Sequence, residues 1–66
     1  MIDERKLKKL RKDAGMTAEK LGFALGVHFS TILHMERGVK QPSLDLYIRI
    51  ADFFGISLDD LRKKNA

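Results

Sequence analysis

The chain has 66 residues, 44% of them hydrophobic and 33% charged, which is enough for one globular domain spanning 1–66 and outside the range of disordered chains. It contains no cysteine, so disulfides, thiolate metal sites and thiol nucleophiles are excluded. No apolar run approaches the roughly 20 residues that span a bilayer, and the N-terminus is charged rather than leader-like, so we expect a cytoplasmic protein with no membrane partner.

The net charge of +4 is unevenly distributed. Segment 3–13 holds six basic residues against three acidic ones, whereas segment 17–42 holds three against two. Such a basic helix is compatible with a polyanionic partner and equally with an ordinary solvated lysine-rich surface.

Apolar spacing and glycine stops predict three short helices in the first part of the chain, over 3–14, 17–25 and 28–37. Leu7, Leu10 and Ala14 follow the i, i+3, i+7 spacing of one helix face. Thr17 is a typical N-cap for the second helix. Gly26 then stands where a sharp turn needs a positive φ.

Two further helices are predicted, the fourth from Ser43 to the residue before Gly55 and the fifth over 57–61. The fourth has two apolar stripes and one polar edge. The first stripe is Leu44, Tyr47, Ile48, Ala51 and Phe54, the second is Leu46, Ile50 and Phe53, and the edge is Asp45, Arg49 and Asp52. Such a helix is either central to the core or uses its second stripe in an oligomer. The apolar excess around Leu46, Ile50, Phe53 and Phe54 fits both.

Segment 17–38, TAEKLGFALGVHFSTILHMERG, resembles the helix-turn-helix of the Cro and phage-repressor family. Leu21, Leu25, Val27, Ile32 and Met35 take the inward places of two steeply crossing helices. Gly22 is small where these helices approach most closely, and Gly26 makes the turn between them. The later runs QPSL, IA and GISLDDL resemble the rest of the family's domain, so that the likeness covers nearly the whole chain.

The resemblance implies a compact all-α, five-helix, lambda-repressor-like domain that regulates transcription. Family members mostly bind double-stranded DNA as two-fold dimers, so a homodimer is expected here. The third helix would lie in the major groove and the start of the second would touch the DNA backbone. Arg11 and Glu36 resemble the family's partly buried ion pair, the alternative being two solvated charges.

Several positions depart from the family pattern. Ala18 stands where the family usually has a glutamine that bonds a phosphate, and Phe23 stands where a charge is more usual. On the third helix, Phe29 and Leu33 offer apolar contact to a thymine methyl but no hydrogen-bond donor. If these three apolar side chains are all exposed, they form a patch of the kind that marks a protein interface, and the same face would bind a protein partner instead of DNA. The alternative is that one or two of them fold back on the core.

The predicted contact residues for DNA or a protein partner lie on the second and third helices and the loop after them: Thr17, Ala18, Lys20, Phe23, His28, Phe29, Ser30, Leu33, His34, Arg37 and Lys40. Two histidines six residues apart point to different sides of a helix, so a metal site is not expected. No group is placed to orient a serine or threonine nucleophile, and the chain is too short for a water-excluded cleft. We therefore expect neither enzymatic activity nor a cofactor.

Overall fold

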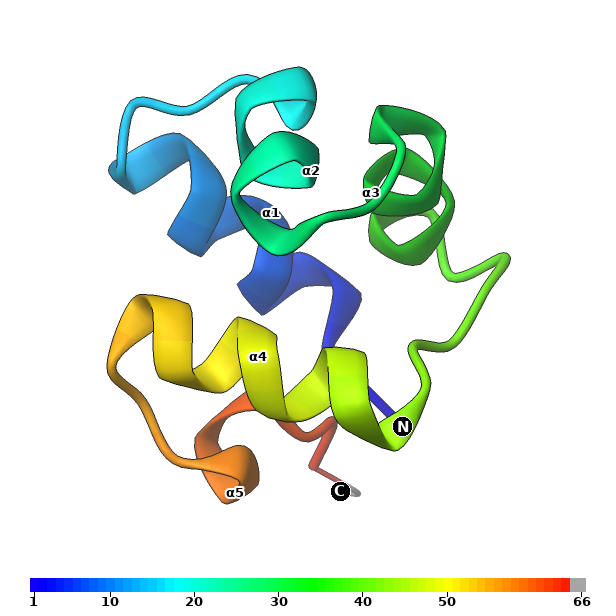
Figure 1. The fold of residues 1–66 in the computed structure, drawn as a ribbon. Coiled ribbons are helices and arrows are strands. Elements are labelled where there is room, and N and C mark those ends of the chain that lie inside the picture. The colour runs from blue at the N-terminus through cyan, green and yellow to red at the C-terminus, as the bar shows by residue number, and fades with distance from the viewer. Residues whose placement is uncertain (65–66) are drawn as a thin grey trace.

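The computed structural model describes residues 1–64 as an all-helical arrangement (Figure 1). Its helices are α1 (Glu4–Asp13), α2 (Ala18–Leu25), α3 (Phe29–Glu36), α4 (Leu44–Phe54) and α5 (Leu58–Leu61). In Figure 1, α2 and α3 lie above α1, and α4 crosses beneath them with α5 at its far end. The predicted fold class and element order are confirmed.

Local capping accounts for where the helices start. The side chains of Asp3, Thr17, Ser43 and Ser57 each accept a hydrogen bond from a backbone N–H in the first turn of the helix that follows. These bonds satisfy donors that a helix N-terminus otherwise leaves unpaired. The first helix is one residue shorter at each end than predicted, because Asp3 is its N-cap and Ala14 its C-cap.

The core is made by inward-facing residues of all the helices and by one residue that precedes α1. The buried hydrophobic residues are Ile2, Leu7, Leu21, Leu25, Ile32, Met35, Leu46, Ile50, Ala51 and Leu61. The predicted inward face of the first helix is partly wrong, since Ala14 is exposed and Arg11 is buried in its place. Along α4, Leu46 and Ile50 belong to the core.

Leu44 is 72% exposed and Phe53 45% exposed, so neither predicted stripe of α4 is wholly buried. Phe54 packs against the core, with its ring edge-on to Phe53 at 5.1 Å between centroids. Among residues 1–64, every helix is too short or too polar to cross a membrane.

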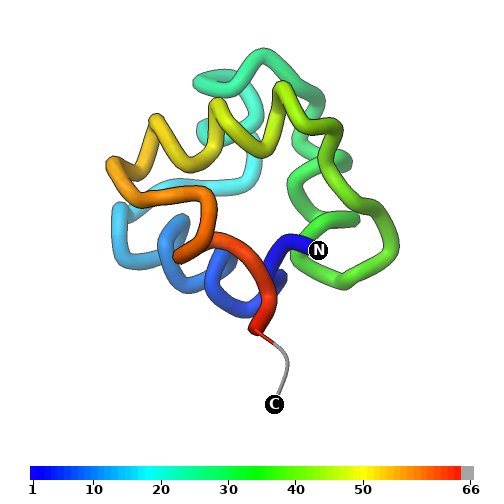
Figure 2. The backbone as a smooth tube through the Cα atoms, turned by 90° about the horizontal axis from the view of Figure 1, so that it is seen from below, coloured from blue at the N-terminus to red at the C-terminus, as the bar shows by residue number. Residues whose placement is uncertain are grey.

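The two ends of the described chain are joined by backbone pairing that the sequence did not predict. Ile2 and Arg62 form an antiparallel bridge, with Asp3 N–H donating to the Leu61 carbonyl at 2.9 Å and Lys63 N–H donating to the Met1 carbonyl at 2.7 Å. Figure 2 shows the first and last described segments side by side. This clasp brings the fully buried Ile2 side chain into the core.

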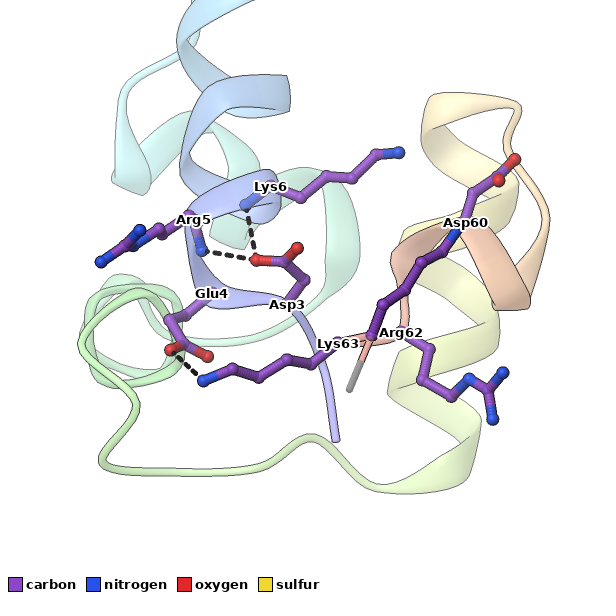
Figure 3. Close-up of a pocket in the computed structure, with 8 residues that line it drawn as sticks. Asp3, Glu4, Arg5, Lys6, Asp60, Arg62 and Lys63 are labelled. Carbon is purple, nitrogen blue, oxygen red and sulfur yellow. Dashed lines mark hydrogen bonds and ion pairs between the residues drawn. The ribbon is translucent and has the colours of Figure 1, made fainter. Parts of the chain in front are cut away.

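Charged side chains line a hollow beside the clasp, between the start of α1 and the C-terminal segment (Figure 3). The Asp3 carboxylate accepts from the backbone N–H groups of Arg5 and Lys6, and Lys63 Nζ donates to Glu4 Oε1 at 3.1 Å. A backbone hydrogen bond at Glu4 and the Lys63 ammonium together hold the pKa of Glu4 below its ordinary value. The Glu4 carboxylate therefore links the start of α1 to the C-terminal segment, whereas the Asp3 carboxylate caps α1.

Shortening the buried Ile2 to alanine is expected to lower the free energy of unfolding by about 2–5 kcal/mol, because it removes buried methyl groups and leaves a cavity. Urea unfolding followed by circular dichroism measures this loss. Val39→Ala is the matched control, because Val39 is 73% exposed and its truncation is expected to change stability by no more than about 0.5 kcal/mol. Equal effects of the two substitutions would show that the clasp does not contribute to the core.

Candidate nucleic-acid interface

The turn between α2 and α3 is built from backbone atoms in close contact. Gly26 has a φ of +74° and ends α2, and the Val27 N–H donates to the Gly22 carbonyl at 2.8 Å. A Cβ atom at residue 22 would lie 2.7 Å from the Val27 carbonyl oxygen and 3.2 Å from the backbone nitrogen of Phe29. The predicted close approach at Gly22 and the predicted glycine turn are both confirmed.

A buried ion pair links α1 to the end of α3. Arg11 Nε and Nη2 donate to the two carboxylate oxygens of Glu36 at 2.6 and 2.9 Å, and Arg11 Nη1 donates to the Met16 carbonyl at 2.9 Å. The side chains are only 11% and 4% exposed, so the prediction of a pair rather than two solvated charges is confirmed. Donating hydrogen bonds to the Glu36 carboxylate raises the pKa of Arg11. In residues 1–64, no buried side-chain nitrogen or oxygen lacks a partner.

Arg49 on α4 contacts the end of α2, which the sequence did not indicate. Its guanidinium donates to the Leu25 carbonyl at the end of α2 and pairs with Asp45 one turn earlier on α4. The Asp45–Arg49–Asp52 edge is exposed as predicted, but Arg49 also contacts another helix. The only feature of the sequence that could have suggested this contact is that Arg49 has a long side chain with hydrogen-bond donors, whereas the other two residues of the polar edge are aspartates.

His28 caps the start of α3. Its Nδ1 accepts from the Ser30 N–H at 3.2 Å and lies 2.8 Å from Ser30 Oγ, and its ring packs against Phe29 with centroids 4.5 Å apart. The sequence placed His28 among the contact residues without predicting this capping role. Histidine is outside the usual set of Ser, Thr, Asp and Asn at this position.

The outward face of α2 and α3 is less uniformly apolar than the sequence suggested. Phe23 is 89% exposed and Phe29 is 40% exposed, whereas Leu33 is half-buried. The condition for an apolar patch of three exposed side chains is therefore not met. One of the three folds partly back, which was the alternative expectation.

The remaining predicted contact residues surround this face. Thr17 is exposed and caps α2, while Ala18 is half-buried and packs on the core. Lys20 and His34 are exposed. Arg37 is the C-cap of α3, and the backbone N–H of Lys40 donates to the His34 carbonyl at 3.3 Å, which places both residues at the end of that helix.

Across residues 1–64, no three His, Asp or Glu side chains gather in a way that could hold a metal ion. The α2–α3 face offers a partly aromatic surface, with exposed cations on α2 and at the end of α3. Comparison with known proteins identifies the fold that presents it. A helix-turn-helix family model matches residues 7–61. The chain belongs to this helix-turn-helix family.

Relatives of this helix-turn-helix protein carry the same description. One is an uncharacterized HTH-type transcriptional regulator of Methanocaldococcus jannaschii, 43% identical over 56 residues that cover 85% of each chain. Another is the uncharacterized HTH-type transcriptional regulator YgzD of Bacillus subtilis, 38% identical with the same coverage of both chains. The helix-turn-helix protein is a transcriptional regulator of this class.

Solved structures show the same architecture. The restriction-modification controller protein C.AhdI of Aeromonas hydrophila is 29% identical over 89% of each chain, with a TM-score of 0.80. The P22 c2 repressor, solved with a synthetic operator, is 22% identical over 98% of each chain with a TM-score of 0.88, and at that identity it shows the fold alone. The predicted likeness to phage repressors is thus confirmed.

Proposed function

We propose that this helix-turn-helix regulator binds double-stranded DNA with α3 in the major groove and the start of α2 against the sugar-phosphate backbone. The observation that carries the proposal is the tight turn between α2 and α3, which Arg49 contacts from α4. The outward face of these two helices lies between exposed cations on α2 and at the end of α3. The P22 c2 repressor, which has the same fold, was solved in complex with a synthetic operator, which supports DNA as the partner. In this function the chain acts as a single cytoplasmic domain, 1–66, and catalyses no reaction.

Phosphate contacts are assigned to polar and cationic side chains around the face. Thr17 Oγ accepts from the Lys20 N–H at 3.1 Å, which leaves its hydroxyl proton free for a phosphate oxygen. Lys20, Arg37 and Lys40 supply charge without reading sequence. The exposed lysines of α1 add to the same field.

Base contacts are assigned to the outward residues of α3, namely Phe29, Ser30, Leu33 and His34. The exposed part of the Phe29 ring suits the methyl group of thymine, and half-buried Leu33 offers a smaller apolar edge. Because few donors remain on this face, we expect an A·T-leaning site.

Duplex binding is expected to weaken steeply with salt, because each neutralised phosphate releases counterions. Arg37→Gln should reduce the slope of log affinity against log salt by about 1. A fluorescence titration of labelled duplex DNA at several salt concentrations measures this. The control is Lys63→Gln, which removes the same charge beside the clasp and should leave the slope unchanged. Lack of binding even at low salt would refute the proposal.

A protein partner is the second candidate, favoured by the 89% exposure of Phe23, which is unusual for a phenylalanine. In that case Phe23→Ala and Phe29→Ala would each cost about 2 kcal/mol or more of partner binding, with weak salt dependence. A steep salt slope for duplex DNA together with no effect of Phe23→Ala on the regulator's binding would count against this candidate.

We also infer a homodimer, formed through α4 and α5. An open hollow of about 280 Å³ lies there, and the residues that line it are Met1, Leu44, Tyr47, Leu58, Asp59 and Arg62. Asp59 and Arg62 form an ion pair at 2.7 Å. Leu44 and Leu58 are 72% and 41% exposed. A two-fold dimer uses the same surface of both copies, so these apolar side chains would be buried against their counterparts. The sequence pointed to Leu46, Ile50, Phe53 and Phe54 for self-association. Of these, Leu46 and Ile50 are in the core and are not available to a partner.

Leu44→Asp is expected to weaken self-association at least tenfold in sedimentation velocity, because it places a charge in the apolar centre of the interface. Val39→Asp changes an equally exposed residue outside the hollow and serves as the control. A monomeric wild type at high concentration, or equal effects of the two variants, would refute this interface.

A further inference from the structure

The first turn of α3 contains a hydrogen-bond arrangement that limits what Ser30 can offer a ligand. The Ser30 N–H donates to Nδ1 of His28 at 3.2 Å. An imidazole nitrogen that accepts a hydrogen bond carries no proton, so the proton of the neutral ring is on Nε2. Ser30 Oγ lies 2.8 Å from the same Nδ1. Because Nδ1 has no proton to give, the Ser30 hydroxyl is the donor in this contact.

Because its proton is donated to His28, the Ser30 hydroxyl cannot also donate to a ligand. A free hydroxyl both donates and accepts, and therefore pairs with any base edge. With its proton engaged by His28, Ser30 Oγ has only lone pairs left for a partner. In the major groove, donors are found on the amino groups of adenine and cytosine, whereas guanine and thymine present acceptors.

We propose that Ser30 is an acceptor-only base reader that selects adenine or cytosine and rejects guanine and thymine. The inference rests on the DNA-binding function proposed above. His28 is its positioning residue, because it acts through the hydroxyl proton of Ser30. The His28 imidazole packs on the Phe29 ring with centroids 4.5 Å apart. This packing restrains rotation of the imidazole away from the Ser30 hydroxyl.

The base preference is tested by selecting bound duplexes from a randomised pool with the wild type and with Ser30→Ala, His28→Asn and His28→Gly. The position read by Ser30 is the one at which Ser30→Ala changes the base distribution. There the wild type should favour adenine or cytosine over guanine and thymine about fivefold, the worth of one net hydrogen bond. Selection of guanine or thymine, or no position that responds to Ser30→Ala, would overturn the proposal.

The two His28 variants isolate the positioning role. Asparagine caps a helix well and its Oδ1 also accepts a hydroxyl proton, so His28→Asn should keep the preference. Glycine is tolerated at an N-cap but offers no acceptor side chain, so His28→Gly should let guanine and thymine rise to near parity. An unchanged preference in His28→Gly would refute the role of His28.

A measurement without DNA separates this inference from the proposed function. Nitrogen–proton correlation NMR of the free protein should show the His28 imidazole as the tautomer with its proton on Nε2. A proton on Nδ1 would overturn the acceptor-only assignment even if the chain binds DNA tightly. The expected tautomer with no binding to any duplex would instead refute the DNA-binding function, and the base preference with it.

Discussion

Replacing Arg11 by methionine is expected to lower the free energy of unfolding by about 3–5 kcal/mol, because it leaves the Glu36 carboxylate, only 4% exposed, without its charge partner. A small domain has a total stability near the low end of about 5–15 kcal/mol, so the variant should keep only about 0–2 kcal/mol and be partly unfolded at room temperature. Urea unfolding followed by circular dichroism measures the loss.

Three further variants make this result interpretable. Lys9→Met breaks the Lys9–Asp13 pair on the same helix, whose side chains are 75% and 63% exposed, and should cost less than about 1 kcal/mol. Arg11→Lys keeps the charge but loses the two-pronged contact, so an intermediate loss is expected. The double variant Arg11→Met/Glu36→Leu should be more stable than Arg11→Met, since no buried charge remains. A single-variant cost no larger than that of Lys9→Met would refute the role of the ion pair.

Gly22→Val is expected to separate α2 from α3 and to abolish duplex binding. The first added atom would lie 2.7 Å from the Val27 carbonyl oxygen, and the neighbours at 3.2 and 3.3 Å are also backbone atoms that have no other rotamer. Overpacking of this kind costs about 1–3 kcal/mol, or more where the backbone must move. Gly22→Ala should do the same more mildly, because the helix preference of alanine offsets about 1 kcal/mol. Thermal unfolding and the duplex titration measure the two effects.

Gly55→Ala is the matched control for crowding. A Cβ there meets no atom within 4 Å, but the φ of +66° imposes a cost of about 1–2 kcal/mol. This variant should therefore lose stability and keep its affinity for DNA at temperatures where it is folded, whereas Gly22→Val should lose affinity even when folded. Equal duplex affinity of the two folded variants would show that the α2–α3 approach does not set the binding surface.

Most of the candidate site could be predicted because its signals are local. The Thr17 cap, the Gly26 turn and the small Gly22 all act within a few residues of themselves, and the structure shows each in its predicted role. The outward residues of α3 followed from the 3.6-residue period once Ile32 and Met35 were assigned inward. Their roles in binding stay predictions.

The failures concern exposure and long-range contacts. The helical period of the sequence does not predict how deeply the Leu33 side chain is buried. It also does not predict that His28 is the N-cap of α3. Ile2 precedes the first predicted helix, so no periodic pattern marks it as core. Arg49 sits on a solvent-facing edge of its own helix, yet it reaches the end of α2.

The sequence by itself determined the helices, their caps, the glycine corner and the family, because these depend on spacing, turn chemistry and side-chain volume over short stretches of chain. Only the tertiary structure decided which partners meet across 24, 25 or 59 residues: Arg49 with Leu25, Arg11 with Glu36 and Glu4 with Lys63. Of these three contacts, only the Arg11–Glu36 pair was expected, and that expectation came from the family resemblance. Contacts of this kind depend on how packed helices are oriented relative to one another. A linear pattern does not encode that orientation residue by residue.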